Sequence, residues 1–285
     1  MAENKCPIGG QAVIEGVLMR SKEKTAIVVR KPDDTFAVRC QENDSVTDEV
    51  AMLKMPVIRG FVKLLESMII GIQALSYSAN QALEEEEQIK PGELFLTLLV
   101  SLALGAGLFI VVPAFSIDLF HKFTSSVVAV NLLEGVVRII IFLAYVLIIS
   151  RMKDIQRVFQ YHGAEHKVIH TLEAEEELTV ANARKHTTLH PRCGTSFLLL
   201  VMIISVLVFS CLGKQDLLPR ILSRLVLVPL IAGISYEFLR FSARHVNNPV
   251  LRILIQPGLW LQKLTTREPD DAQLEVAIRA VKEVL

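Results

Sequence analysis

Long apolar runs alternate with charged segments along this chain, and four of the runs are long enough to cross a lipid bilayer. They occupy approximately residues 94–116, 127–150, 196–213 and 217–238. A hydrocarbon core of about 30 Å is crossed by about 20 helical residues. The pattern therefore predicts a mainly α membrane protein with about four transmembrane helices.

The second predicted span carries polar residues that an apolar helix does not need for crossing. Glu134 and Arg138 are four residues apart, so they can pair on one helix face inside the bundle, and Asn131 lies one turn before them. We interpret this group as structural, holding helices together. The alternative is that it lines a conduction path.

The residues before the first span follow the alternation of short strands. The segments "AVIEGVLM" (12–19), "TAIVVR" (25–30) and "FAVRC" (36–40) are rich in β-branched residues, and "KPDDT" between the last two suits a turn. We therefore expect three strands in a small N-terminal β element.

Amphipathic segments lie on either side of the predicted bundle. Residues 56–75 place their few polar side chains along one stripe, which predicts a helix in the membrane interface or packed against the spans. A crossing helix is the alternative. Residues 249–264 also look interfacial, with Trp260 where an indole ring prefers to lie. Pro269 and the acidic residues after it begin a soluble amphipathic C-terminal helix.

These patterns divide the chain into six parts, and no cleavable signal peptide is expected because no uninterrupted apolar core opens the chain. The parts are a cytoplasmic β element (1–50), an amphipathic interfacial helix with an acidic linker (51–90), transmembrane helices 1–2 (91–150), a cytoplasmic loop expected to form a His/Cys metal site (151–195), transmembrane helices 3–4 (196–245), and an interfacial segment with the C-terminal amphipathic helix (246–285).

Composition supports a membrane protein and gives no sign of a nucleic-acid partner. Hydrophobic residues make up 52% of the 285 residues, while 30 basic residues balance 30 acidic ones. The four cysteines (Cys6, Cys40, Cys193 and Cys211) are scattered, which predicts neither a disulfide framework nor a thiolate zinc cage and favours a reducing compartment.

The distribution of basic residues predicts which side of the membrane the long connection faces. Basic residues flank the connection and follow the last span, whereas the two short opposite loops have little beyond Lys122 and Lys214. Cytoplasmic loops carry such an excess. Both termini and the 151–195 loop are therefore expected in the cytoplasm.

The loop contains the sequence's clearest chemical signal, "FQYHGAEHKVIH" (159–170). It fits H-x-x-E-H, the inverted form of the zinc-peptidase signature H-E-x-x-H. On a helix, His162, His166 and His170 recur every four residues with Glu165 beside them. Two of these imidazoles can reach one zinc ion, and Glu165 is the expected general base. A third cannot easily reach the same ion, so His170 supports the first ion or binds a second one.

A second block of ligands precedes the third span, in "KHTTLHPRCGTSF" (185–197). We expect a shared site in which His190 or Cys193 joins two histidines of the first block, with His186 as a further candidate ligand. Donors of this softness favour zinc, with iron as the alternative. Arg192 is expected to take part in catalysis by holding a carboxylate or phosphate group. Plain interfacial histidines are the competing interpretation, as is a cysteine nucleophile at position 193.

Five sequence blocks together resemble the YqhQ-like family of bacterial multi-pass membrane proteins. They are "GGQAVIEGVLMR" (9–20), "YHGAEHKVIH" (161–170), "HPRCGTSF" (190–197), "SYEFLR" (235–240) and "LTTREPDDAQLEVAI" (264–278). The resemblance covers nearly the whole chain. It implies a bacterial inner-membrane location and a predicted metal-dependent enzyme of unknown function, and it brings no assigned catalytic residues.

The sequence thus favours a metal-dependent hydrolase at the cytoplasmic membrane face, with a peptide or a lipid-linked ester as the first substrates to test. Two other classes are a metal transporter or sensor and a membrane scaffold with a structural metal and a cytoplasmic partner. A lack of acidic or histidine rows in the other spans argues against transport. The lipid bilayer is the expected partner, and the sequence leaves open a homo-oligomer.

Overall fold

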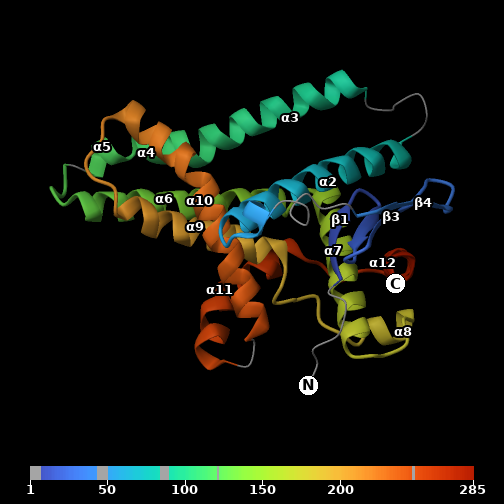
Figure 1. Cartoon of the computed structure of the whole chain (residues 1–285). Coiled ribbons are helices and arrows are strands. Elements are labelled where there is room, and N and C mark those ends of the chain that lie inside the picture. Colours follow the sequence, from blue (N-terminus) through green and yellow to red (C-terminus); the bar gives the residue numbers. More distant parts are fainter. Residues whose placement is uncertain (1–7, 44–50, 84–89, 121, 246–247) are drawn as a thin grey trace.

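The computed structural model describes residues 8–43, 51–83, 90–120, 122–245 and 248–285, so Cys6 lies outside the described residues. It is mostly helical, with one small sheet at the N-terminal end (Figure 1). The strands are β1 (Gly9–Val13), β2 (Gly16–Arg20), β3 (Lys24–Arg30) and β4 (Phe36–Glu42). The main helices are α2 (Ile58–Ala82), α3 (Pro91–Ala106), α6 (Val127–Ile149), α7 (Lys153–Glu173), α9 (Gly194–Ser210), α10 (Leu217–Arg244), α11 (Pro249–Thr265) and α12 (Asp271–Val284). Short helical pieces complete the described chain: η1 (Ala51–Lys54), the π-helix η3 (Gly107–Val111), α4 (Val112–Phe115), α5 (Ile117–Phe120) and α8 (Val180–Ala183).

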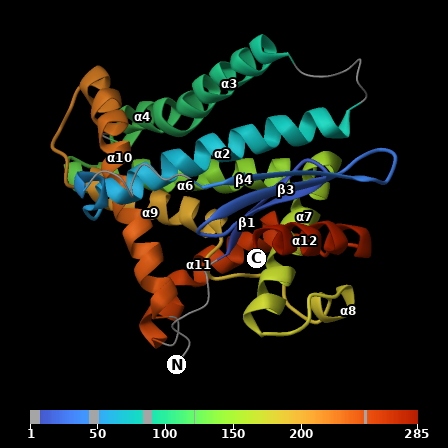
Figure 2. The same ribbon diagram turned by 45° about the vertical axis from the view of Figure 1, so that its right-hand side comes forward.

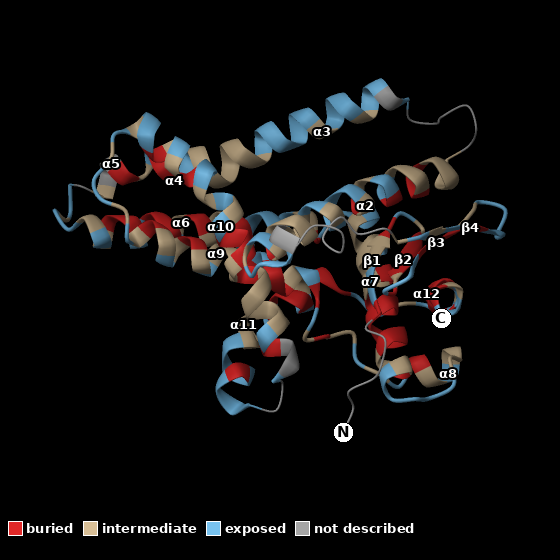
Figure 3. Cartoon of the chain, in the orientation of Figure 1, coloured by how far each residue is buried: buried red, intermediate tan, exposed pale blue. Residues whose placement is uncertain are grey.

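Three helical stretches are long and apolar enough to cross a membrane. They are Gly92–Phe115, Val127–Ile149 and Leu217–Ser242. The third predicted span, 196–213, forms α9, which is apolar but has only 17 residues. Figure 3 shows α3 mostly exposed, and its large apolar side chains face outward, as a lipid-facing helix requires. Length and composition therefore support a membrane protein, with three full-length candidate spans.

The N-terminal β element is an antiparallel meander in the order β1-β2-β3-β4. The predicted strand 12–19 is wrong as a single strand, because the chain reverses at Ile14–Glu15 and forms a hairpin in which Val13 pairs with Gly16. Glu15 adopts a positive φ of 51°, which a continuous strand does not allow. Its carboxylate pairs with Arg157 of α7, which ties the turn to the helix that carries the histidines.

Helices cover both faces of the sheet (Figure 2). On one face α2 packs its Ala74 against Val13, Leu18 and Val29. On the other face, in the larger core of the molecule, α7 packs against β1 and β2, and α12 packs against β2 and β3. The N-terminal strands, the histidine helix and the C-terminal helix therefore form one packed unit beside the bundle.

Helix α7 is separate from the second span, although the two are only three residues apart. The chain leaves helical geometry at Ser150–Met152, and α7 then runs in a sharply different direction from α6 (Figure 1). The predicted interfacial segment 249–264 forms α11, which packs on α9 and leaves Trp260 exposed. Residues 58–75 of the predicted segment 56–75 form the first part of α2, which is not one of the three candidate spans and packs on α10 and the sheet.

Candidate metal centre

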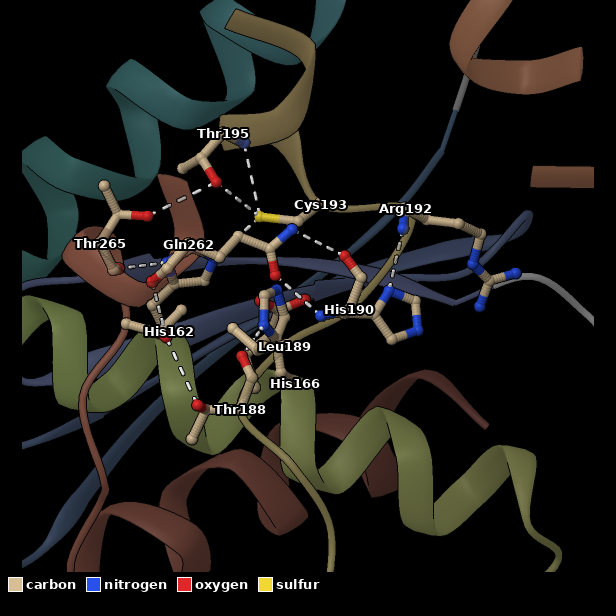
Figure 4. Close-up of polar contacts among 12 residues, drawn as sticks. His162, His166, Thr188, Leu189, His190, Arg192, Cys193, Thr195, Gln262 and Thr265 are labelled. Carbon is tan, nitrogen blue, oxygen red and sulfur yellow. Dashed lines mark hydrogen bonds and ion pairs between the residues drawn. The ribbon is translucent and has the colours of Figure 1, made fainter. Parts of the chain in front are cut away.

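The two ligand blocks meet where α7 passes beneath the 186–193 loop (Figure 4). The four-residue spacing of His162 and His166 places both imidazoles on one face of α7. Their ring centroids are 4.4 Å apart. Cys193 is the residue immediately before α9, and its side chain faces both rings.

The donor atoms of His162, His166 and Cys193 lie within 4.8 Å of one another. His162 Nε2 is 3.1 Å from Cys193 Sγ. Ligands bound about 2.0–2.3 Å from one tetrahedral zinc ion are separated by about 3.5 Å. The three side chains can therefore converge on one ion after small side-chain movements.

Backbone carbonyls hold both imidazoles in the tautomer that metal binding requires. His162 Nδ1 donates to Thr265 O at 2.8 Å, and His166 Nδ1 donates to Thr188 O at 2.5 Å. With the proton on Nδ1, the lone pair of each Nε2 faces the cysteine. His166 Nε2 is buried and has no hydrogen-bond partner among the residues that the structure describes. A buried nitrogen with a free lone pair is suited to coordinate a metal ion.

The sulfur of Cys193 lies at the N-terminus of α9. The backbone N–H of Thr195 donates to Sγ at 3.4 Å, and the Thr195 hydroxyl oxygen is 3.1 Å from it. Amides at a helix N-terminus favour a negative charge. The sulfur of Cys193 is thus held by the first residues of its own helix, in a position that faces the two imidazoles.

Glu165 is buried beside the three donors, with Oε2 3.6 Å from His166 Nε2. Burial raises the pKa of Glu165 above its usual range, while His162, His190 and the Gly10 amide oppose the shift. Strand β1 passes so close that a Cβ at Gly10 would lie 2.6 Å from Glu165 Cγ. A carboxylate with a raised pKa in reach of a metal site is suited to accept a proton from water.

The remaining ligands of the two blocks form a second group at a less buried position. Donor atoms of His170, Glu173 and His190 also lie within 4.8 Å of one another. His190 Nε2 is 3.5 Å from Glu173 Oε2, but Glu173 also pairs with Arg192. A guanidinium on this carboxylate disfavours a cation, so the first group is the better metal site.

The two other predicted site residues lie at the edge of the centre. His186 is in neither group, and its Nε2 faces Glu176 at 3.3 Å. Arg192 turns toward Glu173 and lines the same cavity as Glu165. Burial lowers the pKa of the Arg192 side chain. Its catalytic role stays a prediction.

Sequence reasoning missed the residues that position the ligands. Gln262 of α11 is fully buried, accepts from His190 N and donates to His190 O, each at 2.8 Å. Gly163 lets the segment after α11 cross α7, because a Cβ there would lie 2.0 Å from Arg267 O. This crossing brings Thr265 O to His162. The one available signal was Gln262 itself, a polar residue that directly follows the apolar run Leu259–Trp260–Leu261.

A cavity of about 470 Å³ opens onto the centre. Its lining includes His162, Glu165, His166 and Cys193, together with residues 8–12 of the N-terminal segment. The residues that carry the donor atoms and the carboxylate thus form part of the wall of this cavity.

Buried histidines make the metal-free protein sensitive to acid. Burial lowers the pKa of His166 and His190, and lowers that of His170 to about 4. Because the folded pKa is below the unfolded value of about 6.5, protonation favours the unfolded chain, and stability is lost as pH falls from about 6.5 toward 4. We expect the Tm of chelator-treated protein in detergent to fall by roughly 5–10 °C between pH 7.5 and 5. His170→Gln should flatten part of this fall, and a Tm independent of pH would contradict the expectation.

Comparison with known proteins confirms the resemblance drawn from the sequence blocks. The profile of the family described as "Protein of unknown function (DUF1385)" matches residues 55–285. The chain is also 35% identical over 304 aligned positions to "Uncharacterized protein YqhQ" of Bacillus subtilis (strain 168), covering 100% of this chain and 95% of that protein. No solved structure shows significant similarity. The chain therefore belongs to the DUF1385 family, whose function is unknown.

Proposed function

We propose that this protein is a metal-dependent hydrolase, with zinc as the first candidate ion and iron as the alternative. One observation carries the proposal: His162, His166 and Cys193 converge beside the buried Glu165 at the wall of a cavity. Three protein donors leave one position for water, which is typical of catalytic rather than structural zinc sites.

The protein's own groups have separable roles in this proposal. The ion, when bound, would supply Lewis-acid activation of a water molecule. Glu165 would accept the proton of that water and pass it to the leaving group, a role that suits a carboxylate whose pKa is raised by burial. Thr188 O and Thr265 O keep the imidazoles oriented. The cavity provides space for a peptide or a lipid-linked ester.

We further propose that the centre faces the cytoplasm of a bacterial cell, at the inner membrane. The support comes from the basic residues that flank the 151–195 loop and follow the last span, since such residues concentrate on the cytoplasmic side. The sheet and α12 pack on α7 and therefore lie on the same side as the centre.

Elemental analysis of protein purified without added metal tests the site directly. We expect about one equivalent of zinc or iron in the wild type, and at least tenfold weaker retention in His166→Ala and Cys193→Ala, because each removes one of three ligands. His245→Ala is the matched control, since this exposed histidine lies at the end of α10, outside both ligand groups. A wild type that binds no metal on titration would overturn the proposal.

A second candidate function is a cysteine hydrolase without a metal, favoured by the 3.1 Å contact between His162 Nε2 and Cys193 Sγ. It requires only one imidazole, so it leaves the unpartnered Nε2 of His166 without a role. The two candidates separate by inhibition: 1,10-phenanthroline should abolish metal-dependent hydrolysis, whereas a cysteine hydrolase would survive the chelator. A structural metal in a scaffold would instead give a chelator-sensitive Tm without turnover.

A further inference from the structure

Strand β1 has one free edge, and the direction of its peptide groups follows from the register of the sheet. It pairs with β2 alone, as Gly9↔Arg20 through Val13↔Gly16. Backbone hydrogen bonds from Arg30 N to Glu15 O and from Ser21 N to Lys24 O lie at the two ends of the β2–β3 pair. They show which residues of β2 direct their backbone N–H and C=O groups toward β3. These are the odd-numbered ones, because peptide groups alternate in direction along a strand.

The even-numbered residues of β2 therefore bond to β1, through Gly9, Gln11 and Val13. The peptide groups of Gly10 and Ala12 consequently point away from the sheet. The Gly10 amide interacts with the Glu165 carboxylate. Within the part of the chain that the structure describes, the amide and carbonyl of Ala12 have no hydrogen-bond partner.

This free edge forms a wall of the cavity at the metal centre. Residues 8–12 line the cavity together with Glu165 and Cys193, and Phe159 and Leu198 add apolar side chains to it. Gly9 is exposed, and a Cβ there would meet nothing within 4 Å. A strand laid along β1 between Gly9 and Ala12 would lie beside the Glu165 carboxylate and Cys193, whereas the next outward amide, Ile14 N, already donates to Ser78 Oγ of α2.

We propose that the substrate is an extended polypeptide segment that adds to the edge of β1 as a further strand. Its backbone would bond to the amide and carbonyl of Ala12 and to the carbonyl of Gly10, which places a peptide bond beside Glu165. Main-chain pairing of this kind needs regularly spaced N–H donors, which the acyl chains of a lipid ester lack. The inference rests on the proposed hydrolase for its chemistry, but the binding step can be measured alone.

Binding is measured with a fluorescein-labelled decapeptide of alternating threonine and valine, and with the same peptide N-methylated at every central amide. Fluorescence anisotropy with Glu165→Gln protein in detergent avoids turnover. We expect the methylated peptide to bind at least tenfold more weakly, because it cannot donate to the edge carbonyls. Equal binding of the two peptides, or binding of neither, would overturn the inference.

A pair of substitutions tests the same edge from the protein side. Ala12→Pro removes the outward N–H and is compatible with an edge strand, whereas Ala12→Val adds bulk but keeps the N–H. We expect Ala12→Pro to weaken binding at least tenfold and Ala12→Val by less than threefold, with Tm and metal content measured for both. Equal weakening by the two substitutions would contradict edge pairing.

The outcomes separate this inference from the proposed function. Edge-dependent binding of the peptide without metal-dependent cleavage would refute the hydrolase and retain the strand-binding edge. Hydrolysis of a lipid ester that depends on Glu165, with no binding of either peptide, would retain the hydrolase and refute the polypeptide substrate.

Discussion

Replacing Glu165 with glutamine is expected to lower turnover by the metal-loaded protein by about 10³-fold, within the 10²–10⁴ range of general acid–base catalysis. Glutamine keeps nearly the same shape against Gly10 but cannot accept a proton. Glu165 is not one of the three converging donors, so the metal content should stay near that of the wild type. Turnover of unfolded casein and of a lipid ester in detergent, beside elemental analysis, provides the measurement.

The control for this loss is another carboxylate near the same helix. Glu176→Gln removes a half-exposed carboxylate that faces His186, outside the converging donors, and should leave turnover within about twofold. A Glu165→Gln protein that retains its metal and full turnover would remove the general-base assignment. Loss of metal together with turnover would instead make Glu165 a ligand.

The membrane helices could be predicted from the sequence because their signal is local. Each long apolar run became a helix, and Glu134 and Arg138 do pair one turn apart. Helix α9 has only 17 residues, because it begins at Gly194, directly after the site residue Cys193. The sequence predicted the position of the β element correctly, but it predicted three strands where the structure has four. The missed turn has Ile14 and Glu15 at its centre, and neither is a usual turn residue.

The site could be predicted only as far as helical spacing reaches. The spacing predicts that His162 and His166 share a face, but the choice between His190 and Cys193 depends on the path of the loop. That path is fixed by Gln262, which lies 72 residues beyond His190 in the chain. The role of the Thr188 and Thr265 backbone carbonyls could not be predicted from the sequence, because every residue has a backbone carbonyl.

The contact between the N-terminal strand and Glu165 could not be predicted from the sequence either. Gly9 and Gly10 were part of a recognisable block, but nothing local connects them with Glu165. The connection comes from the way β1 lies against α7, through the sheet's packing on that helix. A binding role for β1 can therefore be inferred only after the fold is known.

The second large effect is expected from Glu134, at the centre of a buried network between α6 and α10. Its carboxylate accepts from Arg138 at 2.7 Å and from Arg224 at 2.6 Å, and all three side chains are almost fully buried. Arg138 also donates to Phe109 O in the π-helix η3, at 2.9 Å. Both guanidinium groups stack near the Phe209 ring, with centroid distances of 4.9 and 5.0 Å. One carboxylate thus balances two cations.

Glu134→Ala should therefore destabilise the protein by about 3–5 kcal/mol, because it leaves two buried guanidinium groups without their counter-ion. Thermal and denaturant unfolding in detergent would show the loss as a lower Tm and midpoint. Glu283→Ala is the matched control, since it breaks a solvent-accessible pair with Arg279 four residues away and should change stability by less than about 1 kcal/mol.

A compensating variant distinguishes lost attraction from lost packing at Glu134. Combining Glu134→Leu with Arg138→Leu and Arg224→Leu removes the charges together, so most of the stability should return if unpaired charge is the cause. Failure of this variant to recover would assign the effect to the hydrogen bonds with Phe109 O and Asn131 instead. If Glu134→Ala itself unfolds like the wild type, water reaches the guanidinium groups, and the polar path between the spans that the sequence left as an alternative would gain support.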